Sequence, residues 1–297
     1  MHLRASLNAI FTVPIVLLTA AAAADEKLPV FVSILPQKYF VQKIGGNLVD
    51  VSIMVKPGAS PATYEPKPRQ MSHISKSKIY FAIGVPFEKT WLKKIAAINT
   101  GMLVVHTDEG IKKIPMPANL HAAEGYSEQM QHPEHGSLDP HIWLSPPLVK
   151  IQAQHILQAF LTVDPVHRSQ YEANYHRFLN EIDAIHYELK HILSGQAGSR
   201  FMVFHPSWGY FAGTYGLEQV AIEIEGKNPK PAQLKELINQ AETYGIKVIF
   251  VQPQFSTKSA DLIAKEIGGK ILFVDPLAED WPANLREVAV KLKSSLR

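Results

Sequence analysis

Two histidines and one aspartate stand at positions of this sequence where metal chemistry is expected. His141 lies between two prolines in the loop-like sequence DPHIWLSP. His205 directly follows the apolar run 201–204, and Asp275 directly follows the apolar run 271–274. Open α/β sheets bind ligands beyond the carboxyl ends of their strands, so these positions favour a role in a site. Neutral imidazole and carboxylate together suit a divalent cation such as zinc.

Each of the three residues also has an ordinary structural explanation. His141 could satisfy a backbone carbonyl within its loop, and His205 could have a structural role before Pro206. Asp275 precedes a proline and is therefore a common turn residue. Only their joint placement at three loop starts predicts a metal site.

A polar stretch at residues 121–137 (HAAEGYSEQMQHPEHGS) contains further histidines. His121, His132 and His135 share it with three glutamates and almost no apolar residues. This composition is typical of a solvated surface loop. The density of imidazole groups also predicts auxiliary metal capture by these three histidines.

Strand-like and helical patterns alternate on both sides of the middle of the chain. This alternation predicts an α/β fold with mostly parallel sheets in two similar lobes, although no internal sequence repeat is evident. The predicted strands are residues 30–35, 49–55, 79–83 and 102–105, then 201–204, 220–222, 248–251 and 271–274. The predicted helices are residues 38–44, 69–77, 88–97, 147–161, 232–244, 259–267 and 284–292.

One long helix is predicted to join the two lobes at residues 164–195. Its apolar positions alternate steps of three and four residues, which places them on one helical stripe. Asp164 suits the N-cap, Pro165 the first turn, and Gly195 a left-handed C-terminus. Roughly 30 residues would span about 45 Å, so the helix would act as a strut. A short coiled coil is the alternative. The stripe consists of Tyr171, Tyr175, Phe178, Ile182, Ile185, Leu189 and Ile192.

The first 24 residues have the pattern of a secretory signal peptide. Arg4 precedes an apolar run at residues 10–18, and small residues lead to Ala24, near which cleavage is expected. We therefore expect a soluble periplasmic protein with a first lobe at 25–163 and a second lobe at 196–297. The whole chain has a formal net charge of +3 without a dense basic run, which argues against nucleic acid as a partner. It contains no cysteine, which excludes disulfides and thiolate metal ligands. We also expect the protein to be a monomer.

Taken in order, several motifs resemble those of the ZnuA-like zinc-binding solute receptors of ABC importers. The resemblance covers nearly all of the mature sequence. It implies two α/β lobes joined by a long helix, a metal cleft between them, and a membrane permease as partner. Carried over to this sequence, it implies His141 from the first lobe, and His205 and Asp275 from the second, as metal ligands. The motifs are LPQKYF at 35–40, PGASP at 57–61, DPHIWL at 139–144, FHPSW at 204–208, EGK at 225–227, PQF at 253–255 and DPL at 275–277.

The chain departs from that family at Ala62, where a first-lobe histidine ligand is usual. Three expected protein ligands remain, and a tetrahedral ion would complete its coordination with water or a substitute. The missing ligand could be replaced by Glu65, His73 or an imidazole of the polar loop. Glu65 and His73 also have ordinary explanations, as a helix-starting residue and a surface residue. Lower affinity or altered metal choice would follow from the missing imidazole.

The ligand types favour Zn²⁺ over manganese, because two imidazoles make a softer site than an oxygen-rich one. Copper and nickel remain open alternatives, as does a manganese or other divalent-metal receptor. A His₂Asp site with an open position is also typical of a zinc metallohydrolase, for which Glu65 is a conceivable general base. A metallochaperone or a metal-dependent adhesin is a further alternative. No short motif pairing a ligand with a base occurs, so the sequence favours a receptor over an enzyme.

Overall fold

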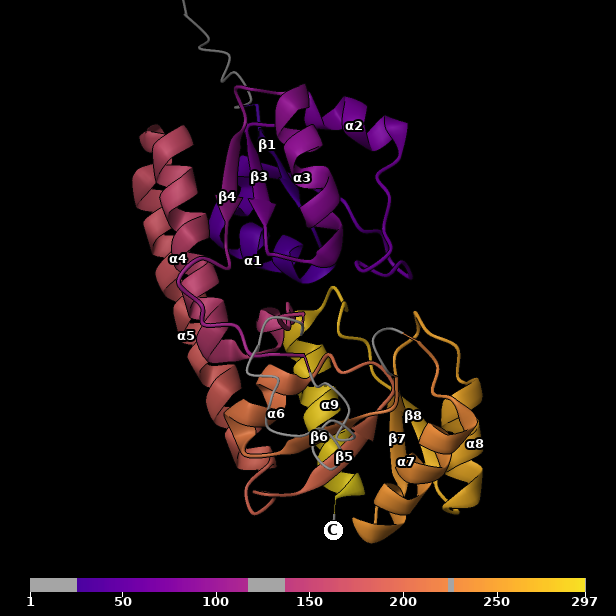
Figure 1. Ribbon diagram of the computed structural model, residues 1–297. Helices are drawn as coiled ribbons and strands as arrows, with labels where there is room; N and C mark the ends of the chain where they lie inside the picture. The colour runs from indigo at the N-terminus through magenta and orange to yellow at the C-terminus, as the bar shows by residue number, and fades with distance from the viewer. Residues whose placement is uncertain (1–25, 117–136, 224–226, 297) are drawn as a thin grey trace, which may run out of the picture.

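The structure is a computed structural model that describes residues 26–116, 137–223 and 227–296 (Figure 1). Two parallel four-stranded sheets form two lobes, as predicted. In the first lobe the strand order is β2-β1-β3-β4, and in the second it is β6-β5-β7-β8. In both sheets the first strand of the lobe therefore lies between its second and third strands, and the fourth strand pairs with the third. The strands are β1 (Leu28–Val32), β2 (Val49–Ile53), β3 (Ile79–Ala82), β4 (Leu103–His106), β5 (Arg200–Val203), β6 (Glu218–Ala221), β7 (Val248–Val251) and β8 (Lys270–Phe273).

Helices connect successive strands in both lobes, which is what parallel pairing requires. In the first lobe they are α1 (Leu35–Gly45), α2 (Pro68–Ile74) and α3 (Pro86–Ile98). In the second they are α6 (Gly209–Tyr215), α7 (Pro231–Thr243) and α8 (Lys258–Glu266), and α9 (Trp281–Ser295) follows the last strand. The predicted strand at 30–35 ends early because Leu35 and Pro36 already form the first turn of α1. The short helix α6, of seven residues, was not predicted.

The connection between the lobes is a pair of helices. After α4 (Pro146–Val163), the chain turns through the 3₁₀ segment η4 (Pro165–His167) into α5 (Arg168–Ile192). These two helices lie side by side along one flank of both lobes (Figure 1). The apolar stripe predicted for α5 is buried at Tyr171, Phe178, Ile182, Ile185 and Leu189, and half-buried at Tyr175 and Ile192.

The ends of the long helix differ from the prediction. Asp164 is not its N-cap, because the Asp164 carboxylate instead accepts a hydrogen bond from the Tyr171 hydroxyl, at 2.6 Å, and lies 2.7 Å from His167 Nδ1. Pro165 starts η4, so α5 begins only at Arg168. At the other end Leu193 is the C-cap, and Gly195 adopts φ +79° in the turn beyond it. The continuous helix therefore has 25 residues.

One apolar core extends from the first lobe through α4 and α5 into part of the second lobe, and a second core covers the remaining part of that lobe. Aromatic side chains connect the lobes. The Trp281 ring of α9 packs edge-to-face on Phe40 of α1 at 5.2 Å between centroids, and Phe40 packs on Phe178 of α5 at 5.8 Å. Both lobes are thus packed against the same strut. Within the described residues, no helix is both long and apolar enough to cross a membrane.

Candidate metal site

The segment that carries His141 is anchored at its start by backbone bonds. Leu138 forms an isolated antiparallel bridge with Pro115, and Asp139 N donates to the Ile114 carbonyl at 2.8 Å. The Tyr210 hydroxyl of α6 donates to the Asp139 carbonyl at 2.9 Å and accepts from Ile114 N at 3.1 Å. The chain leading to His141 is therefore fastened to the second lobe.

The residues after His141 continue this attachment. They form the buried 3₁₀ segment η3 (Ile142–Leu144). The Trp143 indole donates to the Pro276 carbonyl at 2.7 Å, and the Trp281 indole donates to the Trp143 carbonyl at 2.7 Å. Ser145 and Thr214 share a hydroxyl contact at 2.8 Å. His141 precedes the connecting helices in the sequence, yet its segment packs against elements that follow them.

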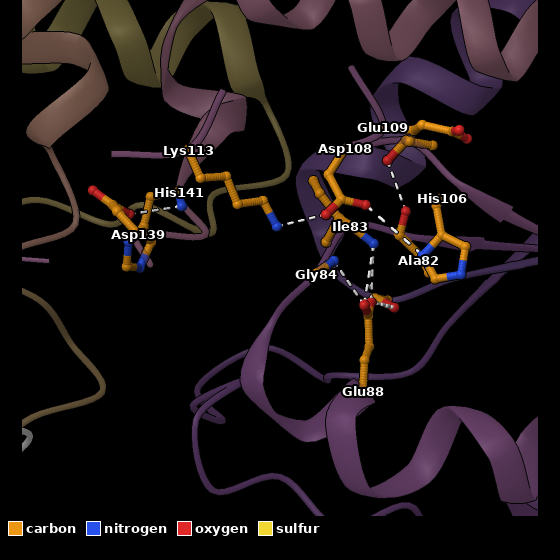
Figure 2. A network of polar contacts seen from close by, with 12 residues as sticks. Ala82, Ile83, Gly84, Glu88, His106, Asp108, Glu109, Lys113, Asp139 and His141 are labelled. Atoms are coloured by element: carbon orange, nitrogen blue, oxygen red, sulfur yellow. Dashed lines mark hydrogen bonds and ion pairs between the residues drawn. The ribbon is translucent and has the colours of Figure 1, made fainter. Parts of the chain in front are cut away.

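The His141 imidazole is buried, with 8 % of the residue exposed. Its Nδ1 lies 2.7 Å from Asp139 Oδ1, and the same oxygen accepts the His141 backbone N–H at 2.8 Å (Figure 2). Burial lowers the pKa of His141, Asp139 acts in the opposite direction, and His205 lowers it further. A lowered pKa favours the neutral imidazole, the form that binds metal.

His205 lies two residues beyond the end of β5, because the strand ends at Val203 and not at the predicted Phe204. It lies beside His141. The two rings are 5.2 Å apart between centroids at an interplanar angle of 71°. His205 Nδ1 lies 2.6 Å from Glu223 Oε1, and the ring stacks on Phe255 at 4.9 Å. Gln252 holds the His205 backbone by accepting from N at 3.1 Å and donating to O at 2.6 Å. Both histidines thus have Nδ1 against a carboxylate, which leaves Nε2 for a ligand.

Asp275 follows β8 as predicted, and its loop contacts the His141 segment through the bond from Trp143 to Pro276. Asp275 Oδ1 accepts from the Gln254 side chain and from Leu277 N, both at 2.9 Å. Across the described ranges, no group of three histidine, aspartate or glutamate residues is placed to hold a metal ion. The structure therefore brings the two histidines together, and Asp275 as a third ligand stays a prediction.

The other candidate residues lie on the first lobe or outside the described part of the chain. Glu65 and Ala62 are exposed in the loop between β2 and α2. His73 is exposed in the last turn of α2, which lies on the side of the first lobe remote from the second (Figure 1). The polar-loop histidines His121, His132 and His135 lie outside the described residues. The fourth ligand therefore stays unassigned.

A polar network within the first lobe surrounds Glu88 and Asp108, and Figure 2 shows it together with Asp139 and His141. The Glu88 carboxyl accepts from Ile83 N at 3.1 Å and Gly84 N at 2.7 Å, and also from the Ser33 hydroxyl. Burial raises the pKa of Glu88 to about 7. Lys113 pairs with Asp108 at 2.5 Å directly over Gly84, where an added Cβ would lie 2.2 Å from Lys113 Nζ. Gly84, with φ +83°, permits this close approach.

The sequence patterns did not single out the two carboxylates that contact the histidines. Asp139 stands two residues before His141, and Glu223 follows the carboxyl end of β6, the neighbour of β5. The strand-end rule that identified His205 applies equally to Glu223. A search for acidic residues at the ends of neighbouring strands would therefore have found it.

Comparison with known proteins gives concordant results. The family model described as "Zinc-uptake complex component A periplasmic" (ZnuA) matches residues 30–294. A crystal structure of ZnuA is 43% identical with a TM-score of 0.82, covering 91% of this chain and 99% of that one. The high-affinity zinc uptake system protein ZnuA of Bacillus subtilis is 27% identical over 255 residues, which are 84% of this chain and 79% of that protein. The zinc-binding protein AdcA of Streptococcus pyogenes serotype M3 is 28% identical over 274 residues, 86% of this chain but only 51% of AdcA.

Proposed function

The chain belongs to the ZnuA family of periplasmic zinc-uptake components, and we propose that it captures Zn²⁺ for the permease of an ABC importer. The ligands in this proposal are His141, His205 and Asp275. The observation that carries it is the contact between the two imidazoles, each with Nδ1 against a buried carboxylate. Histidines that bind metals characteristically have this second contact. The arrangement supports a site for a borderline dication, with zinc preferred over manganese because of its two nitrogen ligands.

Capture in this proposal is the replacement of water ligands on the ion by two imidazoles and a carboxylate. Because the ligands must be deprotonated, affinity falls as the pH drops through the range in which the histidines become protonated. A water or a substitute residue completes the coordination in place of the imidazole missing at Ala62. The product of the binding step is the loaded receptor, so tight binding without turnover distinguishes this function from that of a hydrolase.

The fold supports small movements on loading. Hydrogen bonds of the Trp143 and Trp281 indoles join the segment around His141 to the loop after β8 and to α9. The helices α1, α5 and α9 also share an aromatic cluster. A wide opening of the lobes would break these buried contacts. We therefore infer that loading orders loops next to the site and does not swing one lobe away from the other.

The remaining parts of the proposal concern the cell. Residues 1–24, outside the described residues, are the proposed export signal, and the mature protein is a monomer in the periplasm. Its partner is the membrane permease, with no nucleic acid involved. The three histidines of the polar loop are proposed as auxiliary metal-capture groups.

The test measures zinc in the mature protein and in single-alanine variants. We expect the wild type to bind one tight equivalent by competition with a chromophoric chelator. His141→Ala, His205→Ala and Asp275→Ala should each lose that equivalent, whereas His191→Ala, which removes an exposed imidazole from the last turn of α5, should keep it. Unchanged stoichiometry in all three site variants would refute the assignment, and steady hydrolysis that is lost in His205→Ala would favour an enzyme.

A further inference from the structure

We propose that Asp139 and Glu223 are positioning residues that hold His141 and His205 with Nε2 directed at the captured ion. The inference rests on the proposed function, because it assigns roles around the same site. Neither carboxylate was among the expected ligands. Each contacts Nδ1 of one histidine, at 2.7 Å for Asp139 and 2.6 Å for Glu223.

Asp139 is a fixed anchor because its backbone and its side chain are both held. Its N–H donates to Ile114, and its carbonyl accepts from Tyr210. The residue is completely buried. Its other carboxylate oxygen lies against Gly209 of α6, where an added Cβ would approach Oδ2 to 2.9 Å. The Oδ1 atom that contacts His141 therefore has little freedom to move.

Glu223 holds His205 from one side while Phe255 covers a face of the ring. The Glu223 backbone N–H donates to the Phe204 carbonyl at 3.0 Å, which continues the pairing of β6 with β5. Its side chain is only 4% exposed. The stacked Phe255 ring, at an interplanar angle of 22°, restricts rotation of the imidazole. Together these contacts fix both the plane and the direction of the His205 ring.

The chemistry of the contact selects one tautomer. An ionised carboxylate has only acceptor atoms, so the Nδ1 atom beside it carries the hydrogen. The lone pair then lies on Nε2, on the opposite side of the ring, where a metal ion can bind. The contact also makes the imidazole a stronger donor to the metal. Asp139 and Glu223 thus prepare both histidines before the ion arrives.

The chain supplies a matched control in a third pair of the same kind. His167 Nδ1 lies 2.7 Å from Asp164 Oδ2 at the start of α5. This pair belongs to the turn that precedes the long helix and has no part in the proposed site. Asp164→Asn therefore makes the same chemical change in a histidine–carboxylate pair away from the ion.

The experiment compares Asp139→Asn, Glu223→Gln and Asp164→Asn in the full mature protein. Zinc affinity is measured by chelator competition, and the histidine tautomers of the metal-free protein are read from long-range ¹H–¹⁵N spectra. We expect Glu223→Gln and Asp139→Asn to weaken zinc binding about 10- to 100-fold. The Nδ1–H signature of the affected histidine should be lost or mixed, while Asp164→Asn keeps the wild-type affinity. Glu223→Asp, which retains the charge but withdraws the oxygen, serves as a second variant and should also bind more weakly.

The outcomes separate this inference from the proposed function. If the wild type binds no zinc, or if His205→Ala retains it, the proposed function fails. If those two tests succeed but Asp139→Asn and Glu223→Gln bind zinc like the wild type, only the positioning role is overturned. It is also overturned if affinity falls while the tautomers in the metal-free variants stay unchanged, since Glu223 would then act as a ligand. An equal loss in Asp164→Asn would likewise refute it.

Discussion

A comparison of two buried tryptophans tests how the His141 segment is held. Trp281 and Trp208 are equally buried, each with 1% of the residue exposed. The Trp281 indole donates to the Trp143 carbonyl at 2.7 Å. The Trp208 indole N–H has no hydrogen-bond partner among the described residues. Replacing either tryptophan with phenylalanine therefore removes a similar apolar surface, but only the replacement of Trp281 also removes a hydrogen bond.

The expected difference follows from what each substitution leaves behind. Both variants lose part of an indole ring from a packed core, a loss of roughly 1 kcal/mol of burial before any cavity is counted. Trp281→Phe also leaves the buried Trp143 carbonyl unsatisfied, which costs about 1–3 kcal/mol. We therefore expect Trp281→Phe to lower the free energy of unfolding by about 1–3 kcal/mol more than Trp208→Phe.

Urea denaturation of the metal-free protein, followed by far-ultraviolet circular dichroism, measures this difference. Trp143→Phe is a second hydrogen-bonded case, because the Trp143 indole donates to the Pro276 carbonyl at 2.7 Å. It should resemble Trp281→Phe. If Trp208→Phe is as destabilising as the other two variants, packing alone fastens the segment and the reasoning from hydrogen bonds is refuted.

Three further predictions concern metal affinity, pH and the strut. Ala62→His should tighten zinc binding about tenfold or more by restoring an imidazole, and chelator competition would reveal no gain if another group already fills that position. The pKa of Glu88 is raised to about 7 from an ordinary 4.5, so its contribution to stability is full below pH 4.5 and is lost as the pH rises to 7. Between pH 4 and 8, urea titrations should show the wild type losing about 3 kcal/mol relative to Glu88→Gln, and parallel pH profiles would contradict this. Ile185→Ala, in the buried stripe, should lower the free energy of unfolding by about 3 kcal/mol. Tyr187→Ala, with 71% of the residue exposed, should change it by less than about 0.5 kcal/mol. Equal effects of the two variants in thermal or urea melts would count against the assigned stripe.

Local patterns were sufficient to predict most of the fold. The steps of three and four residues along α5 match its buried face because helical periodicity alone places those side chains together. The apolar runs of the eight strands were recognised because both faces of a parallel sheet are covered. The ends of the helices and strands were predicted less accurately. Asp164 was expected to cap the helix, but its carboxylate contacts Tyr171 and His167, a preference that only the packed turn reveals.

The candidate site likewise has features that follow from the sequence and others that only the fold determines. The sequence by itself singled out His141 and His205 as candidate ligands, because a polar residue at a loop start or a strand end is a local feature. Only the tertiary structure showed that the His141 segment packs on the second lobe, and that Asp139 and Glu223 face the two imidazoles. Those contacts join parts of the chain far apart in sequence, and they arise from how α6, β6 and the loops pack together. Periodicity carries no information about such packing, so the positions of the histidines followed from the sequence while their orientation depended on the fold.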